Sequence, residues 1–183
     1  MSEPCVDAPI HPLAIPIHHT RNIREPMNIK FIVVSKTDIP YLQTGIDEYV
    51  GRLKHYCDFE MVIIPALKNQ GKASPDDIKE REGALILKQV EKVDGIVLLD
   101  EHGKEYTSVG FSEYLQKQMN AGTRTLAFVV GGAFGFSPAV YAATNHKVSL
   151  SQMTFNHQMV RLFFVEQLYR AFTILRHEKY HNE

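Results

Sequence analysis

Short runs of apolar and β-branched residues alternate along this chain with longer amphipathic stretches, beginning at residue 29. Apolar runs of about four to eight residues predict strands. Several of these runs are apolar on both faces, which is typical of strands in a parallel sheet that helices cover on both sides. The predicted strands cover residues 29–34, 59–64, 95–99, 125–130 and 146–150.

The stretches between these runs carry residue types that begin helices. Pro40 follows Asp38 closely and suits the first turn of a helix, where an N–H has no partner in any case. The Ser-Pro-Asp-Asp segment at 74–77 combines a capping serine, a first-turn proline and two acids that favour the helix dipole. Ser137-Pro138 predicts a shorter helix, Gly122 the end of a helix over about 110–120, and the last helix covers about 157–176.

This order of elements, β-α-β-α-β-α-β-α-β-α, predicts the fold class. Strict alternation of strands and helices favours an α/β layered fold, with a parallel-type sheet flanked by helices and right-handed crossovers. Ligands of such sheets gather beyond the carboxyl ends of the strands. Candidate functional residues are therefore expected in the segments that follow the predicted strands.

The last predicted helix is apolar around most of its circumference. Val160, Phe164, Leu168, Phe172 and Leu175 form one stripe, and further apolar side chains lie outside it at positions 162, 163, 165, 169 and 174. Burying one Leu or Phe side chain is worth about 1.5–3 kcal/mol, so several exposed ones are costly for a soluble monomer. We expect a homodimer through this helix; the alternative is deep burial within one subunit.

Composition narrows the class of protein. The chain has 183 residues, of which 44% are hydrophobic, and this suits one domain. Lys and Arg number 20 against 21 acidic residues, so any contact with nucleic acid is expected to be local. Cys5 and Cys57 form no C-x-x-C pattern, and no run reaches the roughly 18 apolar residues of a membrane helix. A cytoplasmic protein is expected.

The first 26 residues differ from the rest because five prolines interrupt them. We predict that residues 1–26 are a disordered or loosely attached extension and that residues 27–183 form the folded domain. His11, His18 and His19 lie in this extension, which is a poor metal cage without ordered partners. No metal site is expected there.

Three segments that follow predicted strands are candidates for a common pocket: residues 98–103, 131–138 and 150–157. Glycines at 131, 132 and 135 allow the backbone to turn sharply and to approach a ligand closely, although such turns are also ordinary architecture. The spacing is not the G-x-G-x-x-G of a dinucleotide site, and no G-x-x-x-x-G-K-[ST] loop is present. These patterns favour a cofactor without phosphates, for which S-adenosylmethionine (SAM) is one candidate.

His157 and Arg161 lie one turn apart at the start of the last helix. An imidazole there can accept a proton, and a guanidinium can hold a phosphate or a base edge. Helix capping plus a surface arginine is the alternative. Nearer the carboxyl end, Arg170 and Arg176 also suit the helix dipole, and Tyr180 is a candidate for stacking on a base.

Several enzyme classes are disfavoured by the motifs. The sequence has no G-x-S-x-G elbow and no cluster of Cys and His ligands, and its one H-E-x-x-H spacing, at 177–181, follows the last predicted helix instead of lying on one. Hydrolases and metalloenzymes are therefore poor candidates.

From Met27 to the end, the chain resembles the RlmH family, the pseudouridine-N3 methyltransferases of large-subunit ribosomal RNA, which belong to the SPOUT class. The similarity covers nearly the whole folded region in the right order. It rests on the segments 96–100, 131–138, 149–154 and 157–172 and on Tyr180-His181.

The resemblance implies a SPOUT fold whose carboxyl-terminal segment passes through a loop to form a trefoil knot, an exception to the rule that chains avoid knots. It also implies a homodimer, with RNA approaching where the two subunits meet, and RNA contacts from Arg170, Tyr180 and His181. The SAM pocket of the family maps onto Leu99, Gly131, Leu150, Ser151, Gln152, Met153, Thr154 and Phe155.

The chain also departs from the family pattern. Family members often have proline after the Gly-Gly pair and before the histidine, where this chain has Ala133 and Asn156. Some have a basic residue directly after the terminal Tyr-His, where this chain has Asn182. The last difference puts the contribution of the tail to RNA binding in doubt.

The reaction that the resemblance implies is the attack of N3 of a pseudouridine in 23S ribosomal RNA on the methyl group of SAM, on the assembled ribosome. Because the N3–H is only weakly acidic, we expect His157 to act as the base and Arg161 to stabilise negative charge. A nonenzymatic ribosome-binding factor is the main alternative, and it predicts no affinity for SAM. A nucleotide-dependent oxidoreductase is a second, and it predicts binding of NAD or a flavin.

Overall fold

The computed structural model describes residues 27–67 and 73–180. Ten elements alternate strictly between strand and helix, as predicted. Each predicted element is present, with bounds within a few residues of the prediction except at the end of the third strand. In chain order they are β1 (Asn28–Val34), α1 (Pro40–Leu53), β2 (Asp58–Ile64), α2 (Pro75–Val90), β3 (Gly95–Glu105), α3 (Ser108–Asn120), β4 (Thr125–Val130), α4 (Pro138–Ala142), β5 (Lys147–Ser149) and α5 (Met159–Leu175).

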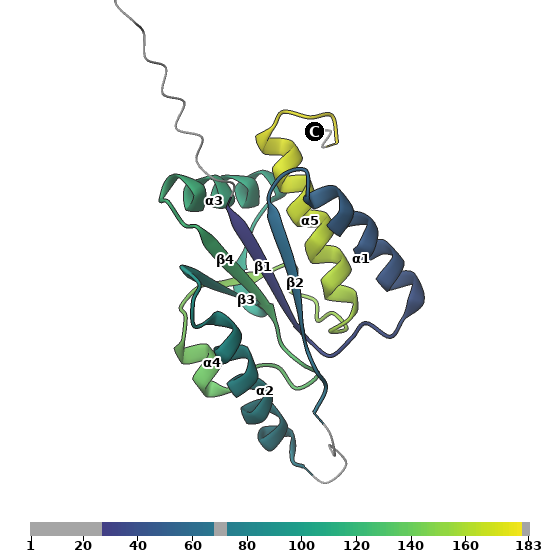
Figure 1. The fold of residues 1–183 in the computed structure, drawn as a ribbon, viewed down its shortest axis with the longest axis vertical. Coiled ribbons are helices and arrows are strands. Elements are labelled where there is room, and N and C mark those ends of the chain that lie inside the picture. Colours follow the sequence, from purple (N-terminus) through teal and green to yellow (C-terminus); the bar gives the residue numbers. More distant parts are fainter. Residues whose placement is uncertain (1–26, 68–72, 181–183) are drawn as a thin grey trace, which may run out of the picture.

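All five strands form one sheet in the order β2-β1-β4-β3-β5, and every pairing is parallel (Figure 1). The carboxyl ends of the strands therefore lie along one edge of the sheet. β1, β4 and β3 are the central strands, each with a neighbour on both sides, and Asn28 of β1 lies opposite both Asp58 and Thr125. This confirms the predicted α/β class with a parallel sheet.

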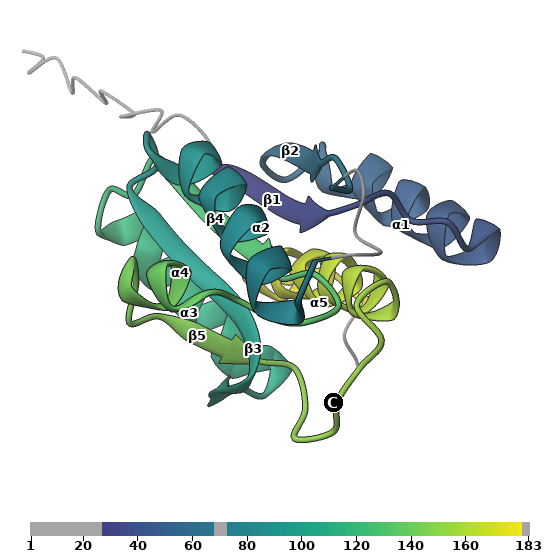
Figure 2. The ribbon, with the colours of Figure 1, turned by 90° about the horizontal axis from the view of Figure 1, so that it is seen from below.

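Side chains of each central strand alternate between two apolar layers, because successive residues of a strand point to opposite faces. Phe31 and Phe128 lie in the layer that α1, α3 and α5 cover, where both rings pack against Phe164. Ile32 and Val129 lie in the second layer, which α2 and α4 cover. Figures 1 and 2 show the helices on the two sides of the sheet.

The predicted helix starts are confirmed in detail. The Ser74 hydroxyl accepts a hydrogen bond from the Asp77 N–H, and the Asp77 carboxylate accepts one from the Ser74 N–H, which completes a capping box. At the start of α4 the Ser137 hydroxyl accepts a hydrogen bond from the Val140 N–H, with Pro138 in the first turn. Gly122, just past the end of α3, has a positive φ of 82°, which glycine adopts at no steric cost.

β3 is longer than predicted. The prediction ended at residue 99, whereas the strand continues to Glu105 with a register shift against β5 between Leu99 and Lys104. Its second half is polar and mostly exposed, so it has no apolar run to indicate a strand. Gly103 lies directly against β5, where a Cβ would be 2.6 Å from the carbonyl carbon of Val148.

α5 packs against α1 and α3, and this contact buries much of its apolar surface. Phe164, Val165 and Leu168 have no exposed surface, so burial within one subunit accounts for one side of the helix. Phe163, however, remains 43% exposed, and Leu162 and Ile174 are only half-buried. The predicted dimer through this helix and the knot stay predictions.

Some predictions fall outside the described residues. The extension at residues 1–26, with its three histidines, and His181 in the tail are among them. Within residues 27–67 and 73–180, no helix has both the length and the apolar character needed to cross a membrane.

Candidate cofactor and RNA site

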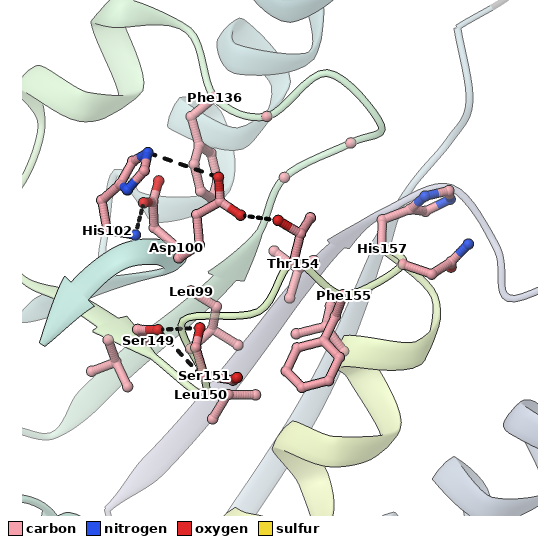
Figure 3. Close-up of a pocket in the computed structure, with 18 of the residues that line it drawn as sticks. Leu99, Asp100, His102, Phe136, Ser149, Leu150, Ser151, Thr154, Phe155 and His157 are labelled. Carbon is pink, nitrogen blue, oxygen red and sulfur yellow. Dashed lines mark hydrogen bonds and ion pairs between the residues drawn. The ribbon is translucent and has the colours of Figure 1, made fainter. Parts of the chain in front are cut away.

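A cavity of about 540 Å³ lies beyond the carboxyl ends of β3, β4 and β5 (Figure 3). The three segments that the sequence indicated meet there. This volume lies within the range of about 300–1,000 Å³ that small-molecule sites occupy. Of the predicted cofactor residues, the cavity is lined by Leu99, Gly131, Leu150, Ser151, Met153, Thr154 and Phe155.

Gln152 is the one predicted cofactor residue that does not line the cavity. Its side chain is exposed and points toward β3, where its Nε2 lies 3.4 Å from the Glu105 carboxylate. Its neighbours on both sides line the cavity. Within this turn the Gln152 side chain therefore points away from the cavity, toward β3.

The wall formed by β3 is acidic and is held by hydrogen bonds. The Tyr141 hydroxyl donates to the Asp100 carboxylate at 2.6 Å, and the His102 N–H donates to the same carboxylate at 2.8 Å. Burial together with this contact raises the pKa of Tyr141 to about 12, so the phenol stays a donor at neutral pH. Across the cavity, the Thr154 hydroxyl donates to the Glu101 carboxylate at 2.6 Å.

Residues 131–137, the glycine loop, form the second wall. Its backbone borders the cavity directly at Gly131, Gly132 and Gly135, which have no side chains. The loop closes on itself, with the Gly135 N–H donating to the Gly132 carbonyl at 3.1 Å. Gly135 has a φ of 81°, which favours glycine. A Cβ on Gly131 would lie 3.1 Å from the backbone of Gly135, so a larger residue would push the two sides of the loop apart.

The third wall is a turn that the serines of segment 149–154 stabilise. The Ser149 hydroxyl donates to the Ser151 carbonyl at 2.8 Å, and the Ser151 hydroxyl accepts from the Met153 N–H at 2.9 Å. Figure 3 shows Leu150 on this segment and Phe155 directly after it, with Leu99 of β3 nearby. The cavity therefore has an apolar floor as well as polar walls.

His157 lines the cavity and follows this turn directly. Its imidazole is half-buried, and burial together with the positive charge of Arg161 lowers the pKa of His157 below its usual value of 6.5. The imidazole is therefore neutral at pH 7 and able to accept a proton. In the view of Figure 3 it lies on the side of the cavity opposite Asp100 and His102.

Arg161 is fully buried and does not line the cavity. Its guanidinium donates to the carbonyls of Val34 at 2.6 Å and Ser35 at 3.1 Å and to the Thr37 hydroxyl at 2.9 Å. Its Nε donates to the His157 carbonyl at 3.1 Å. The alternative of a surface arginine is therefore wrong, since this side chain ties the start of α5 to the end of β1.

Arg170 and Tyr180 lie at the other end of α5. Arg170 is roughly 16 Å along the helix from its first residue, at 1.5 Å per residue. Its guanidinium pairs with Glu166 at 2.7 Å and lies 4.8 Å from the centre of the Tyr180 ring. The Tyr180 hydroxyl is 3.1 Å from the hydroxyl of Tyr49. Within one chain, neither Arg170 nor Tyr180 lines the cavity.

Two residues at the site escaped the sequence analysis. Tyr141 of α4 gave no signal, since only the fold brings it to Asp100. Glu82 of α2, which lies behind the glycine loop, did leave a signal. It occupies the position between Ile78 and Ile86 on the buried face of the helix, where an apolar residue is expected.

The fold and the cavity define an α/β protein with a ligand-sized site at the carboxyl edge of a parallel sheet. The family model described as "Predicted SPOUT methyltransferase" matches residues 27–181. A ribosomal RNA large subunit methyltransferase H of Flavobacterium johnsoniae is 57% identical over 157 residues, which are 86% of this chain and all of that protein. The chain belongs to the SPOUT methyltransferase family.

Further relatives have the same name. A protein of the same name from Parabacteroides distasonis is 55% identical over 86% of this chain and all of its own length. Among solved structures, the SpoU methyltransferase AviRb of Streptomyces viridochromogenes, in complex with AdoMet, aligns with a TM-score of 0.40 and 14% identity. That alignment covers 85% of this chain and 63% of AviRb.

Proposed function

We propose that this protein is a SAM-dependent methyltransferase that modifies N3 of a pseudouridine in 23S ribosomal RNA, on the assembled ribosome in the cytoplasm. The observation that carries the proposal is the cavity at the ends of β3, β4 and β5, where seven of the eight predicted cofactor residues meet. The names of the relatives support ribosomal RNA as the substrate class.

The residues of the cavity fit this cofactor. SAM carries an adenosine and a cationic sulfonium, and it has no phosphate. Leu99, Leu150 and Phe155 provide apolar surface for a purine ring. The carboxylates of Asp100 and Glu101 favour a cation in the cavity. When bound, SAM supplies the methyl group and the leaving group.

The protein then has to align the acceptor and accept one proton. SAM would supply the methyl group to N3 of the pseudouridine, with its sulfur as the leaving group, and the His157 imidazole would accept the N3 proton. The lowered pKa of His157 supports this role, because the neutral form predominates at pH 7. His157 is thus the proposed catalytic base.

For Arg161 we propose a role through His157. Its Nε holds the His157 carbonyl, and its charge contributes to the lowered pKa of the imidazole. The expected stabilisation of negative charge on the uracil ring would act over a distance, since the guanidinium is buried. Arg161 therefore acts as a positioning residue.

RNA binding involves both subunits in this proposal. Arg170 and Tyr180 lie far from the cavity of their own chain. A two-fold axis perpendicular to α5 pairs the two helices in opposite directions, and this brings the tail of one subunit toward the cavity of the other. The exposed Phe163 near the start of α5 supports such a contact. Together with His181, these residues then contact RNA at the subunit interface.

The test is transfer of labelled methyl from SAM to ribosomes that lack the modification, followed by mass spectrometry of the nucleosides. N3-methylpseudouridine in the large-subunit RNA is the expected product. SAM binding without labelled ribosomes would point to another RNA acceptor. If the protein binds ribosomes and has no affinity for SAM, the nonenzymatic factor is the better description.

A further inference from the structure

Glu82 is a buried carboxyl group in α2. Only 5% of the residue is exposed, and it lies between the buried Ile78 and Ile86. Among the residues that the structure describes, its Oε2 has no hydrogen-bond partner. A buried polar atom without a partner costs about 1–3 kcal/mol, and native proteins retain few of them. The group therefore requires an explanation.

The nearest backbone to this carboxyl is that of the glycine loop. A Cβ on Gly132 would lie 2.2 Å from the Glu82 Oε2 and 3.1 Å from its Oε1. Gly132 lines the cavity, whereas Glu82 does not. The carboxyl therefore touches the loop from behind, on the side away from the cavity.

The next residue of α2 contacts the far end of the same loop. A Cβ on Gly83 would lie 2.3 Å from the hydroxyl oxygen of Ser137, the residue that caps α4. Two successive residues of α2 thus support the loop at Gly132 and at Ser137. Because a helix is rigid over one turn, α2 fixes the position of the glycine loop beside the cavity.

We propose that Glu82 is a positioning residue for the cofactor pocket, whose unpartnered carboxylate oxygen accepts a main-chain N–H of the glycine loop when the cofactor is bound. The bond fixes the loop against the cofactor and satisfies the buried oxygen. The cost of the unpaired oxygen is then confined to the cofactor-free protein. This inference rests on the proposed function, since it assumes that SAM occupies the cavity.

The test compares Glu82→Met and Glu82→Gln with the wild type. Methionine fills a similar volume without a polar atom, and glutamine keeps an acceptor oxygen in the same place. Glu80→Met is the matched control, since Glu80 lies on the exposed side of the same helix. SAM affinity is measured by calorimetry, and the stability of the cofactor-free protein by urea unfolding.

We expect Glu82→Met to weaken SAM binding about tenfold or more, because misplaced binding groups carry penalties of this order. Without cofactor its stability should equal or exceed that of the wild type, since an unpaired buried oxygen is gone. Glu82→Gln and Glu80→Met should bind within about threefold of the wild type, on the reasoning that both keep the loop contact intact.

A loss of stability in Glu82→Met that parallels the loss of affinity would mean that Glu82 serves packing alone, and the inference would be wrong. Unchanged affinity in both Glu82 variants would also overturn it while leaving the proposed function intact. If the wild type itself fails to bind SAM, both proposals fall together.

Discussion

At the scale of single residues, Arg161 connects two parts of the chain that are distant in sequence, residues 34–37 and the start of α5. Its four hydrogen bonds reach the end of β1, the loop after it and the carbonyl of His157. A buried guanidinium is stable only where its donors find acceptors, and here most of those acceptors are backbone oxygens. The position of the candidate base therefore depends on this side chain.

We expect Arg161→Met to lower the free energy of unfolding by about 3 kcal/mol or more, because it leaves buried carbonyls without donors. Urea unfolding measures the change. Arg124→Met, at an exposed position before β4, is the control and should change stability little. A loss below about 1 kcal/mol in Arg161→Met would show that water or neighbouring groups replace its hydrogen bonds.

The pKa of His157 leads to a prediction about pH. Burial and the charge of Arg161 disfavour the protonated imidazole, so its folded-state pKa lies below 6.5. The form that accepts a proton then persists below pH 6.5, and methyl transfer should decline only at more acidic pH. The dependence of kcat/KM on pH measures this midpoint.

Replacement of the imidazole tests the same assignment. His157→Ala is expected to lower the methylation rate under saturating SAM by about a hundredfold or more and to remove the acidic limb. His146→Ala, at an exposed position before β5, is the control. An unchanged rate in His157→Ala would show that another group takes the proton.

At the scale of elements, the second half of β3 positions the cofactor wall. It pairs with β5 after the register shift, and it holds Val148 and Ser149 beside the cavity. The close contact of Gly103 with the backbone of Val148 permits this pairing. The irregular strand thus determines where the turn at 149–154 begins.

Gly103→Ala should therefore disturb both the sheet and the cofactor site. The added methyl group meets backbone atoms that cannot move aside, so we expect a loss of about 1–3 kcal/mol in stability and weaker SAM binding. Gly51→Ala in α1 is the control, since no atom lies within 4 Å of its Cβ, and it should stabilise the helix by up to about 1 kcal/mol. Equal stabilities for the two variants would contradict the role of Gly103.

At the scale of the whole molecule, the predicted dimer explains why the start of α5 keeps an exposed aromatic ring. The Phe163 ring contacts Phe155 of the cavity wall, with 5.0 Å between ring centres. We expect Phe163→Glu to be folded but monomeric in sedimentation experiments and to methylate ribosomes poorly. Ile63→Glu on the edge strand β2, where Ile63 is 42% exposed, should remain dimeric. A wild-type protein that sediments as a monomer at micromolar concentration would contradict the predicted dimer.

Shared sites can be tested by mixing variants. If the tail of one subunit serves the cavity of the other, His157→Ala chains and Arg170→Ala chains should each be poorly active, and their mixture should recover part of the activity. The recovery arises because a mixed dimer pairs an intact cavity with an intact tail. A mixture no more active than its components would show that both residues act within one chain.

The elements and the class of fold followed from local information. Helix caps such as Ser74 and apolar runs such as 125–130 act through neighbours in sequence, so the sequence alone predicts the elements that they form. The three pocket segments were also predictable, because the carboxyl ends of parallel strands meet at one edge of the sheet. The individual cofactor residues came from family resemblance rather than from the pattern.

Only the tertiary structure decided the roles of Arg161, Glu82 and the end of β3. Arg161 bonds to Val34 across 127 positions, and Glu82 meets Gly132, which lies in another element of the chain. From sequence alone, charged residues on a helix are predicted to face solvent. Whether they are buried depends on which distant part of the chain packs beside them. The polar half of β3 forms a strand for the same reason, since its partner β5 provides the hydrogen bonds that its own sequence does not indicate.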